Sequence, residues 1–189
     1  MPLIVMAGLP GTGKSSLAKG IAQALSHHAY HKDWSHTISR PIILNKDEIR
    51  SALFPPELIE YSTTQDDFCM NILLSVVTYL LQKDPQRPVL LDGRTFTRDY
   101  QVQTVEKHMQ SVDAHLYWIY CTCDAKTAQQ RLLRDAQHGS HPAVNRTPDL
   151  YEKIAMTAEP LTATHLLVNT EQSLDTCIDI SLKYLGYAD

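Results

Sequence analysis

Short apolar runs alternate along this chain with segments in which apolar residues recur every three or four positions. The runs have the length of buried strands, and the recurring positions indicate amphipathic helices. Strands are expected at residues 3–7, 42–44, 89–91, 115–120 and 165–168. Helices are expected at residues 13–26, 65–82, 100–110, 125–137, 150–158 and 174–185, with a short one through Ile49 and Leu53. This order predicts a parallel sheet covered by helices on both faces.

Two long polar stretches interrupt the alternation. Residues 27–40 are expected to form a surface connection, and residues 138–149 are expected to form a lid between two helices. Thr64 and Asp67 have the spacing of a capping box, which predicts that a long helix begins there. No internal repeat or interdomain linker is visible, so residues 1–189 are expected to form a single domain.

The first expected strand leads directly into a glycine-rich turn that fits G-x-x-x-x-G-K-[ST] at every fixed position. In such a turn the backbone N–H groups point inward and form an anion site. Lys14 adds a charge that reaches the β- and γ-phosphates, and the Ser15 hydroxyl is a candidate Mg²⁺ ligand. A bound nucleoside triphosphate is therefore expected. Its candidate binding residues are Gly8, Leu9, Pro10, Gly11, Thr12, Gly13, Lys14, Ser15 and Ser16.

Ligands of open parallel sheets collect at the carboxyl ends of the strands, and charged residues occur at those ends here. After the second strand, Asp47 and Arg50 are one helical turn apart and can face the same side of a cleft. Asp47 is a candidate base for an attacking hydroxyl, and Arg50 can hold an anionic substrate or the transferred phosphoryl group. The alternative is an ordinary salt bridge in the first turn of a helix.

The third strand ends in Asp92, which has the position of the second P-loop motif and is a candidate Mg²⁺ ligand, directly or through water. The alternative is an aspartate that begins a turn with Gly93. Arg94 and Arg98 follow in the same loop as candidate substrate contacts, or else as surface arginines. After the fifth strand, topology alone suggests that the loop around Asn169 and Thr170 lies beside the adenine base.

Arg131 and Arg134 are three residues apart on the helix that precedes the expected lid, and the lid also holds Arg146. Phosphoryl transfer needs positive charge on oxygens that gain charge in the transition state. Arginines on a mobile segment supply that charge after closure excludes water. The alternative is the solvated face of an amphipathic helix.

Taken together, these residues resemble the P-loop kinases grouped with the zeta toxins, chloramphenicol phosphotransferase and the 5′-kinase domain of polynucleotide kinase, within the AAA-type ATP-binding proteins. The resemblance lies in residues 8–15, 45–50 and 91–93, with Arg98 behind them and the pair of arginines before the lid. It implies a three-layer P-loop sandwich with sheet order 2-3-1-4-5. It also implies Asp47 as the base and Arg131 or Arg134 as the phosphate contact.

The resemblance implies ATP with Mg²⁺ as the phosphoryl donor. GTP is less favoured, because residues 45–48 place the aspartate of the N-K-x-D pattern one position early and after the wrong strand. The leading hypothesis is an ATP-dependent kinase acting on a hydroxyl of a small-molecule or nucleotide-like acceptor. Two alternatives stay open: a polynucleotide 5′-hydroxyl kinase, and an ATP-binding regulatory or toxin-like effector with a protein partner.

Composition and charge limit the kinds of molecule that this chain is expected to bind. The net charge of −4 and pI of about 6.1 give no overall basic field, so nucleic acid is not the favoured acceptor. The apolar stretch 72–81 is too short to span a bilayer, which argues against a membrane protein. Four cysteines without disulfide or zinc spacing and no visible secretory signal point to a cytoplasmic setting. The sequence leaves the acceptor and the oligomeric state open.

Overall fold

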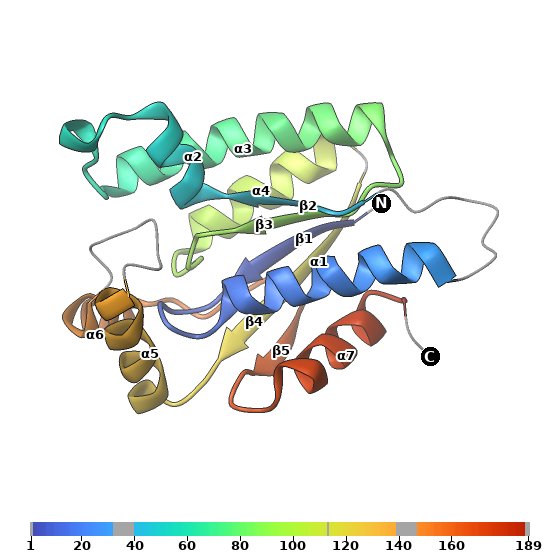
Figure 1. Cartoon of the computed structure of the whole chain (residues 1–189). Helices are drawn as coiled ribbons and strands as arrows, with labels where there is room; N and C mark the ends of the chain where they lie inside the picture. Colours follow the sequence, from blue (N-terminus) through green and yellow to red (C-terminus); the bar gives the residue numbers. More distant parts are fainter. Residues whose placement is uncertain (1, 32–39, 113, 139–146, 188–189) are drawn as a thin grey trace.

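Five parallel strands form one sheet in the order β2–β3–β1–β4–β5 (Figure 1). The computed structural model describes residues 2–31, 40–112, 114–138 and 147–187. The strands are β1 (Pro2–Ala7), β2 (Ile42–Asn45), β3 (Val89–Asp92), β4 (His115–Thr122) and β5 (His165–Asn169). In the centre, Leu3 of β1 is paired with Val89 on one side and with Leu116 on the other. Both the parallel sheet and the predicted strand order are confirmed.

Helices connect the strands as the sequence predicts. They are α1 (Lys14–His31), α2 (Lys46–Leu53), α3 (Thr63–Lys83), α4 (Asp99–Ser111), α5 (Ala125–His138), α6 (Pro148–Thr157) and α7 (Leu174–Tyr184), with a 3-10 turn at Pro56–Leu58. The predicted loop at residues 27–31 is wrong, because α1 continues through His31. The remainder of that connection, residues 32–39, lies outside the described residues.

The predicted start of α3 is also wrong. The helix begins at Thr63, and the N-cap is Ser62, whose hydroxyl accepts the N–H of Gln65 at 3.1 Å. The bond spans three residues, as in the predicted cap, but it forms two positions earlier. Serine and threonine are both favoured N-cap residues, so spacing alone does not choose between Ser62 and Thr64.

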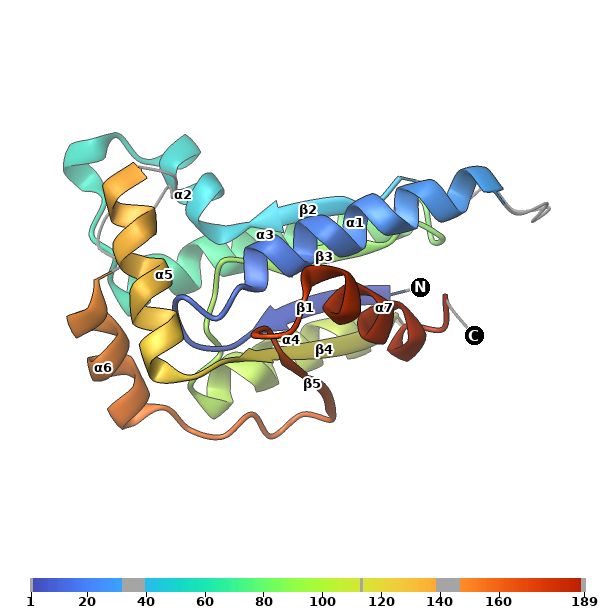
Figure 2. The same ribbon diagram turned by 60° about the horizontal axis from the view of Figure 1, so that its bottom comes forward.

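Helices cover the two faces of the sheet and make a three-layer sandwich (Figure 2). The alternation of side chains along the buried strand β1 serves both layers. Its residues Leu3 and Val5 pack in the cluster that includes α3 and α4, whereas Ile4 and Met6 pack in the cluster of α1 and α7. A strand buried on both faces reads as a continuous apolar run, which is how β1 appears in the sequence.

Helices α5 and α6 lie beyond the carboxyl ends of the strands (Figure 2). They pack on each other through Leu132 and Tyr151. Of the predicted lid, residues 139–146 lie outside the described residues, including Arg146. Across the described residues, none of the helices is both long enough and apolar enough to cross a membrane.

Candidate functional site

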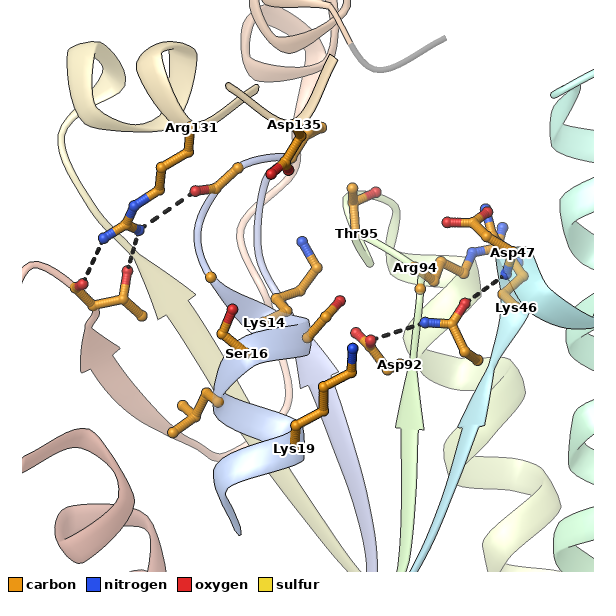
Figure 3. Close-up of a pocket in the computed structure, with 18 of the residues that line it drawn as sticks. Lys14, Ser16, Lys19, Lys46, Asp47, Asp92, Arg94, Thr95, Arg131 and Asp135 are labelled. Carbon is orange, nitrogen blue, oxygen red and sulfur yellow. Dashed lines mark hydrogen bonds and ion pairs between the residues drawn. The ribbon is translucent and has the colours of Figure 1, made fainter. Parts of the chain in front are cut away.

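A cavity of about 740 Å³ lies at the carboxyl ends of the strands. Figure 3 shows the phosphate loop and α1 on one side of it, and the ends of β2 and β3 on the other. Helices α5, α6 and α7, the loop after β5 and the first part of α3 with the segment before it also line the cavity. The predicted site residues that line the cavity are Pro10, Gly11, Gly13, Lys14, Ser15, Ser16, Asp47, Arg50, Asp92, Arg94, Arg131 and Thr170.

The phosphate loop needs glycine where its backbone presses on neighbouring elements. Gly11 has φ +78°, and a Cβ there would lie 2.5 Å from the carbonyl oxygen of Ala128 in α5. Gly8 has φ +131°, and its Cβ would lie 2.3 Å from the carbonyl oxygen of Cys121 in β4. Both the left-handed backbone and the close approach exclude a side chain. These contacts fix the loop against the sheet and against α5.

Lys14 projects from the start of α1 into the cavity (Figure 3). Its ammonium group donates hydrogen bonds to the carbonyl oxygens of Gly8 at 2.7 Å and Leu9 at 2.8 Å. Leu9 itself packs against the α5–α6 cluster, and the Thr12 hydroxyl donates to the Leu9 carbonyl at 2.8 Å. Gly8, Leu9 and Thr12 therefore shape the loop, while Lys14, Ser15 and Ser16 line the cavity.

Asp92 at the end of β3 is 2% exposed and has one carboxylate oxygen with no hydrogen-bond partner. Its other oxygen accepts a bond of 3.0 Å from the Asn45 amide, whose own oxygen caps α2. A buried acceptor without a partner is costly, and a cation would satisfy it. Within the described part of the chain, no cluster of three or more His, Cys, Asp or Glu residues could hold a metal. Magnesium held mainly by phosphates and water fits this single carboxylate.

Opposite the phosphate loop, four charged side chains of α2 and α3 form what we call the α2–α3 charge cluster: Lys46, Asp47, Arg50 and Asp66. Asp47 accepts a bond of 2.7 Å from Arg50 and lies 3.3 Å from the Lys46 ammonium group. Asp66 lies 2.8 Å from the same ammonium group and also contacts Arg50. Lys46, Asp47 and Arg50 are all at least nine-tenths buried. The cluster therefore fixes the Asp47 carboxylate by side-chain contacts on two sides.

Burial changes the acid–base chemistry of this cluster. It lowers the pKa of Lys46 from 10.5 to about 8, against the opposing pull of the Asp47 carboxylate. Desolvation, with the nearby charges of Arg50 and Arg94, disfavours the charged ammonium group more than the Asp47 carboxylate favours it. Arg50 also lies over the ring of Tyr61, 5.0 Å from its centroid, and Tyr61 lines the cavity.

The two arginines of the loop after β3 have different positions. Arg94 is 6% exposed, lines the cavity and contacts Asp67 of α3 at 2.5 Å. Arg98 lies outside the cavity lining, where it donates to the carbonyl oxygen of Thr157 at 2.5 Å and lies 3.5 Å from Glu159. The structure thus brings Arg94 to the site, and Arg98 connects its loop to the end of α6.

The two arginines of α5 also differ. Arg131 donates to the hydroxyl of Thr170 at 2.9 Å, to its carbonyl at 2.8 Å and to the Gly11 carbonyl at 3.5 Å. It therefore joins the phosphate loop to the loop after β5. Arg134 is exposed and is not part of the cavity lining, whereas Asp135 is (Figure 3).

Several lining residues have no counterpart among the predictions. They are Leu17, Lys19, Asn45, Lys46, Glu48, Tyr61, Asp66, Gly93, Thr95, Asp135, Leu150, Ile154, Gln172, Leu174 and Cys177. Asn45 and Lys46 stand beside Asp47 in the sequence, so their place at a strand end could have identified them. Asp66 and the α6 residues belong to no motif, and their position follows from tertiary packing.

Comparison with known proteins agrees with this architecture. Residues 3–159 match the AAA_33 family model, described as an AAA domain. No curated protein matches the chain. Among solved structures, the chain is similar to an APS kinase, CysC, from Mycobacterium tuberculosis in complex with AMPPNP and APS. The TM-score is 0.70 and the identity 18%, over 98% of each chain.

Two further solved structures share the fold. A gluconokinase from Sinorhizobium meliloti matches with a TM-score of 0.63 and 17% identity, over 98% of this chain and 91% of that one. Kti12 from Chaetomium thermophilum, in complex with ADP-AlF3, matches with a TM-score of 0.68 and 12% identity over the whole of both chains. At these identities the likeness establishes the P-loop fold.

Proposed function

Because the chain belongs to the AAA_33 family of AAA domains, we propose that it is an ATP-dependent kinase that phosphorylates a hydroxyl group of a small molecule. One observation supports this best. Lys14 of the phosphate loop and the buried carboxylate of Asp47 line the same cavity from opposite sides. A kinase needs a cradle for the donor and a base for the acceptor within one enclosed space.

On the donor side, we assign the phosphate loop to the triphosphate of ATP. The backbone N–H groups of Gly11 and Gly13 and the ammonium group of Lys14 would contact the phosphates. Ser15 and Asp92 would hold Mg²⁺, which neutralises charge on the phosphate oxygens when bound. The structural neighbours in complex with AMPPNP and with ADP-AlF3 support the choice of an adenine nucleotide.

On the acceptor side, Asp47 would accept the proton of the attacking hydroxyl. The acceptor oxygen forms a bond to the γ-phosphorus, and the bond from that phosphorus to the bridging oxygen breaks. The leaving ADP keeps the electron pair of that bond. Arg50 and Lys46 hold Asp47 in place at 2.7 and 3.3 Å, so its geometry is set before the acceptor arrives.

The arginines of α5 would act on the donor side. We propose that Arg131, which already contacts the phosphate loop, stabilises charge on the transferring group. Arg134 would add a second positive charge from the same helix. Within the P-loop kinases, the pattern of residues 45–50 and the α5 arginines favours the group of zeta toxins, chloramphenicol phosphotransferase and polynucleotide 5′-kinase.

A screen for phosphorylated products tests this function. The purified protein is incubated with ATP, Mg²⁺ and a broad panel of hydroxyl compounds, and mass spectrometry detects acceptors that gain a phosphate. A Lys14→Ala variant is run beside it as the control. We expect a product that forms with the parent protein and is lost in the variant. Tight ATP binding without any product would instead indicate an ATP-binding effector.

A further inference from the structure

One aromatic residue close to Asp47 restricts what the acceptor can be. We infer that Tyr61 determines acceptor specificity by packing its ring against a planar ring that the acceptor carries next to the reacting hydroxyl, an inference that rests on the proposed kinase function. Three observations lead to it. They are the strained backbone of Tyr61, the hydrogen bonds that maintain this strain, and the guanidinium group that connects the ring to Asp47.

Tyr61 has a backbone conformation that is costly for a bulky side chain. Its φ is +51°, and among the described residues only one other non-glycine residue, Phe96 at +55°, has a positive φ. Phe96 is 2% exposed and its ring packs edge to face on Trp118 at 4.9 Å, so the hydrophobic core explains its strain. Tyr61 is only partly buried and lines the cavity. Strain of this kind, outside the core, is typical of residues that contact a ligand.

Hydrogen bonds fix the chain on both sides of Tyr61. The side chain of Gln65, which is 7% exposed, accepts the N–H of Glu60 at 3.0 Å and donates to the carbonyl of Leu58 at 2.8 Å. Ser62 caps α3, and its hydroxyl donates to the Glu60 carboxylate at 2.9 Å. A strained residue persists only when its surroundings over-determine it, and these contacts do so. The backbone of Tyr61 is therefore fixed before an acceptor binds.

A single guanidinium group connects the Tyr61 ring to the proposed base. The central carbon of the Arg50 guanidinium lies 5.0 Å from the centroid of the ring, and Nη1 of the same group donates to the Asp47 carboxylate at 2.7 Å. Because Arg50 is 2% exposed, it holds the ring and the carboxylate in a fixed relation. Tyr61 and Asp47 both line the cavity, and Asp47 lies across it from Lys14 (Figure 3). Tyr61 is therefore on the acceptor side.

A fixed aromatic ring in this position favours an acceptor that is itself planar. Aromatic rings pack on one another in offset or edge-to-face arrangements that contribute more than the buried area alone. Nucleic acid bases and other flat rings pack on tyrosine in the same way, because each has a π-face. The packing depends on the flat ring and not on the net charge, so neutral and anionic acceptors both satisfy it. An acceptor whose hydroxyl reaches Asp47 brings its adjoining atoms to Tyr61.

Matched pairs of acceptors test the inference. Uridine is compared with dihydrouridine, and phenethyl alcohol with cyclohexylethanol, because the members of each pair have nearly the same size and only one has a flat ring. Any other ring-bearing acceptor that the broad panel yields is compared with its own ring-saturated analogue. We expect kcat/KM, measured by mass spectrometry with ATP and Mg²⁺, to be at least about 5-fold higher for the flat member of each pair.

Variants of Tyr61 separate contact with the acceptor from a structural role. Tyr61→Phe keeps the ring and should keep the preference for flat acceptors. Tyr61→Asn removes the ring and relieves the strain, because asparagine tolerates a positive φ. It should raise KM for the best flat acceptor by about 10-fold and abolish the preference within each pair, with KM for ATP and Tm close to the parent values. A lower Tm with an equal loss for every acceptor would show that Tyr61 has only a structural role.

Tyr79→Asn is the matched control. Tyr79 also has a cation near its ring, with the Lys83 ammonium group 5.8 Å from the centroid, but it is 60% exposed and outside the cavity lining. This variant should leave KM for the acceptor unchanged, and a rise equal to that of Tyr61→Asn would contradict the inference. Equal kcat/KM within every pair, or products only from compounds without a flat ring, would overturn the inference and leave the kinase function intact. If no compound of the broad panel yields a product, the kinase function itself fails.

Discussion

The phosphate loop and the α2–α3 charge cluster face each other across one cavity, but they are built from different parts of the chain. The loop consists of consecutive residues whose backbone takes a shape that only glycine permits at Gly8 and Gly11. The cluster consists of side chains from two helices, with Asp66 of α3 contacting both Lys46 and Arg50 of α2. A local backbone motif forms the donor side, whereas tertiary contacts form the acceptor side.

The two regions therefore differ in how they recognise a ligand and in how they respond to substitution. A cradle of backbone N–H groups recognises any polyphosphate, because it responds to charge and shape. A cluster of paired side chains depends on each member, since removing one charge leaves its partner buried. We therefore expect substitutions in the loop to abolish donor binding and substitutions in the cluster to change the use of the acceptor.

The largest effect is expected at Lys14. Lys14→Ala should lower the rate of phosphoryl transfer by ~10³-fold, because it removes the positive charge that stabilises the transferring group. The rate is measured by ADP release in the presence of an acceptor. Lys19→Ala is the comparison, since Lys19 also lines the cavity but is exposed. An equal loss in both variants would mean that the general positive charge matters, and not the position of Lys14.

On the acceptor side, Asp47→Asn should lower kcat by ~10²-fold, because the amide cannot accept the proton of the hydroxyl. The KM for ATP should change little. Glu48→Gln serves as the control, since Glu48 is the adjacent carboxylate, which also lines the cavity but is exposed. Equal turnover of Asp47→Asn and the parent protein would remove Asp47 from the mechanism and leave the cluster with a structural role.

In the loop, Gly11→Ala should lower the free energy of unfolding by about 2–3 kcal/mol, because it combines a left-handed backbone with a clash against α5. Urea denaturation measures this change. Gly186→Ala is the matched control: Gly186 has φ +79°, but its Cβ would meet nothing within 4 Å. That control should cost about 1 kcal/mol from the backbone alone. If the two costs were equal, the contact with Ala128 would contribute nothing.

In the cluster, Asp66→Asn should lower the free energy of unfolding by about 2 kcal/mol, because Arg50 and Lys46 both lose a charged partner. Asp84→Asn breaks the ion pair with Arg87. In that pair the Arg87 side chain is 30% exposed and the Asp84 side chain is 28% exposed. That surface pair should be worth less than about 1 kcal/mol. Thermal or urea unfolding of both variants compares the two pairs, and a similar cost for each would show that burial does not strengthen the cluster.

The smallest effect is a pH dependence of stability. Burial lowers the pKa of Lys46 to about 8 in the folded protein, whereas 10.5 is the ordinary value. Between these values the unfolded chain binds more protons, so the contribution of Lys46 to stability rises with pH. We expect a gain of about 1 kcal/mol between pH 8 and pH 9. The gain should be absent in Lys46→Met, and parallel pH profiles for parent and variant would show that Lys46 titrates normally.

The sequence predicted the features that depend on local patterns. The buried apolar runs at residues 3–7 and 89–91 predicted strands β1 and β3. The spacing of Gly11, Gly13 and Lys14 predicted the phosphate loop. Asp47 and Asp92 were found because they follow strands of a parallel sheet. The two residues lie close together because β2 pairs with β3, which places Asn45, at the end of β2, opposite Asp92.

The features that sequence reasoning missed depend on contacts between distant segments. Asp66 lies 20 positions from Lys46 along the chain, and no motif links them. Arg94 and Arg98 look alike in the sequence, but packing directs one into the cavity and the other to Thr157. Likewise, nothing in the sequence distinguishes Leu150 and Ile154 from core residues of an amphipathic helix.

The binding of ATP by the phosphate loop is the central claim, and calorimetry tests it most directly. AMPPNP is titrated into the purified protein with Mg²⁺, and the same titration is made with Lys14→Ala and Asp47→Asn. We predict a measurable heat with the parent protein and with Asp47→Asn, and a heat that is lost in Lys14→Ala. No heat from the parent protein at millimolar nucleotide would contradict the assignment of this cavity to a nucleoside triphosphate.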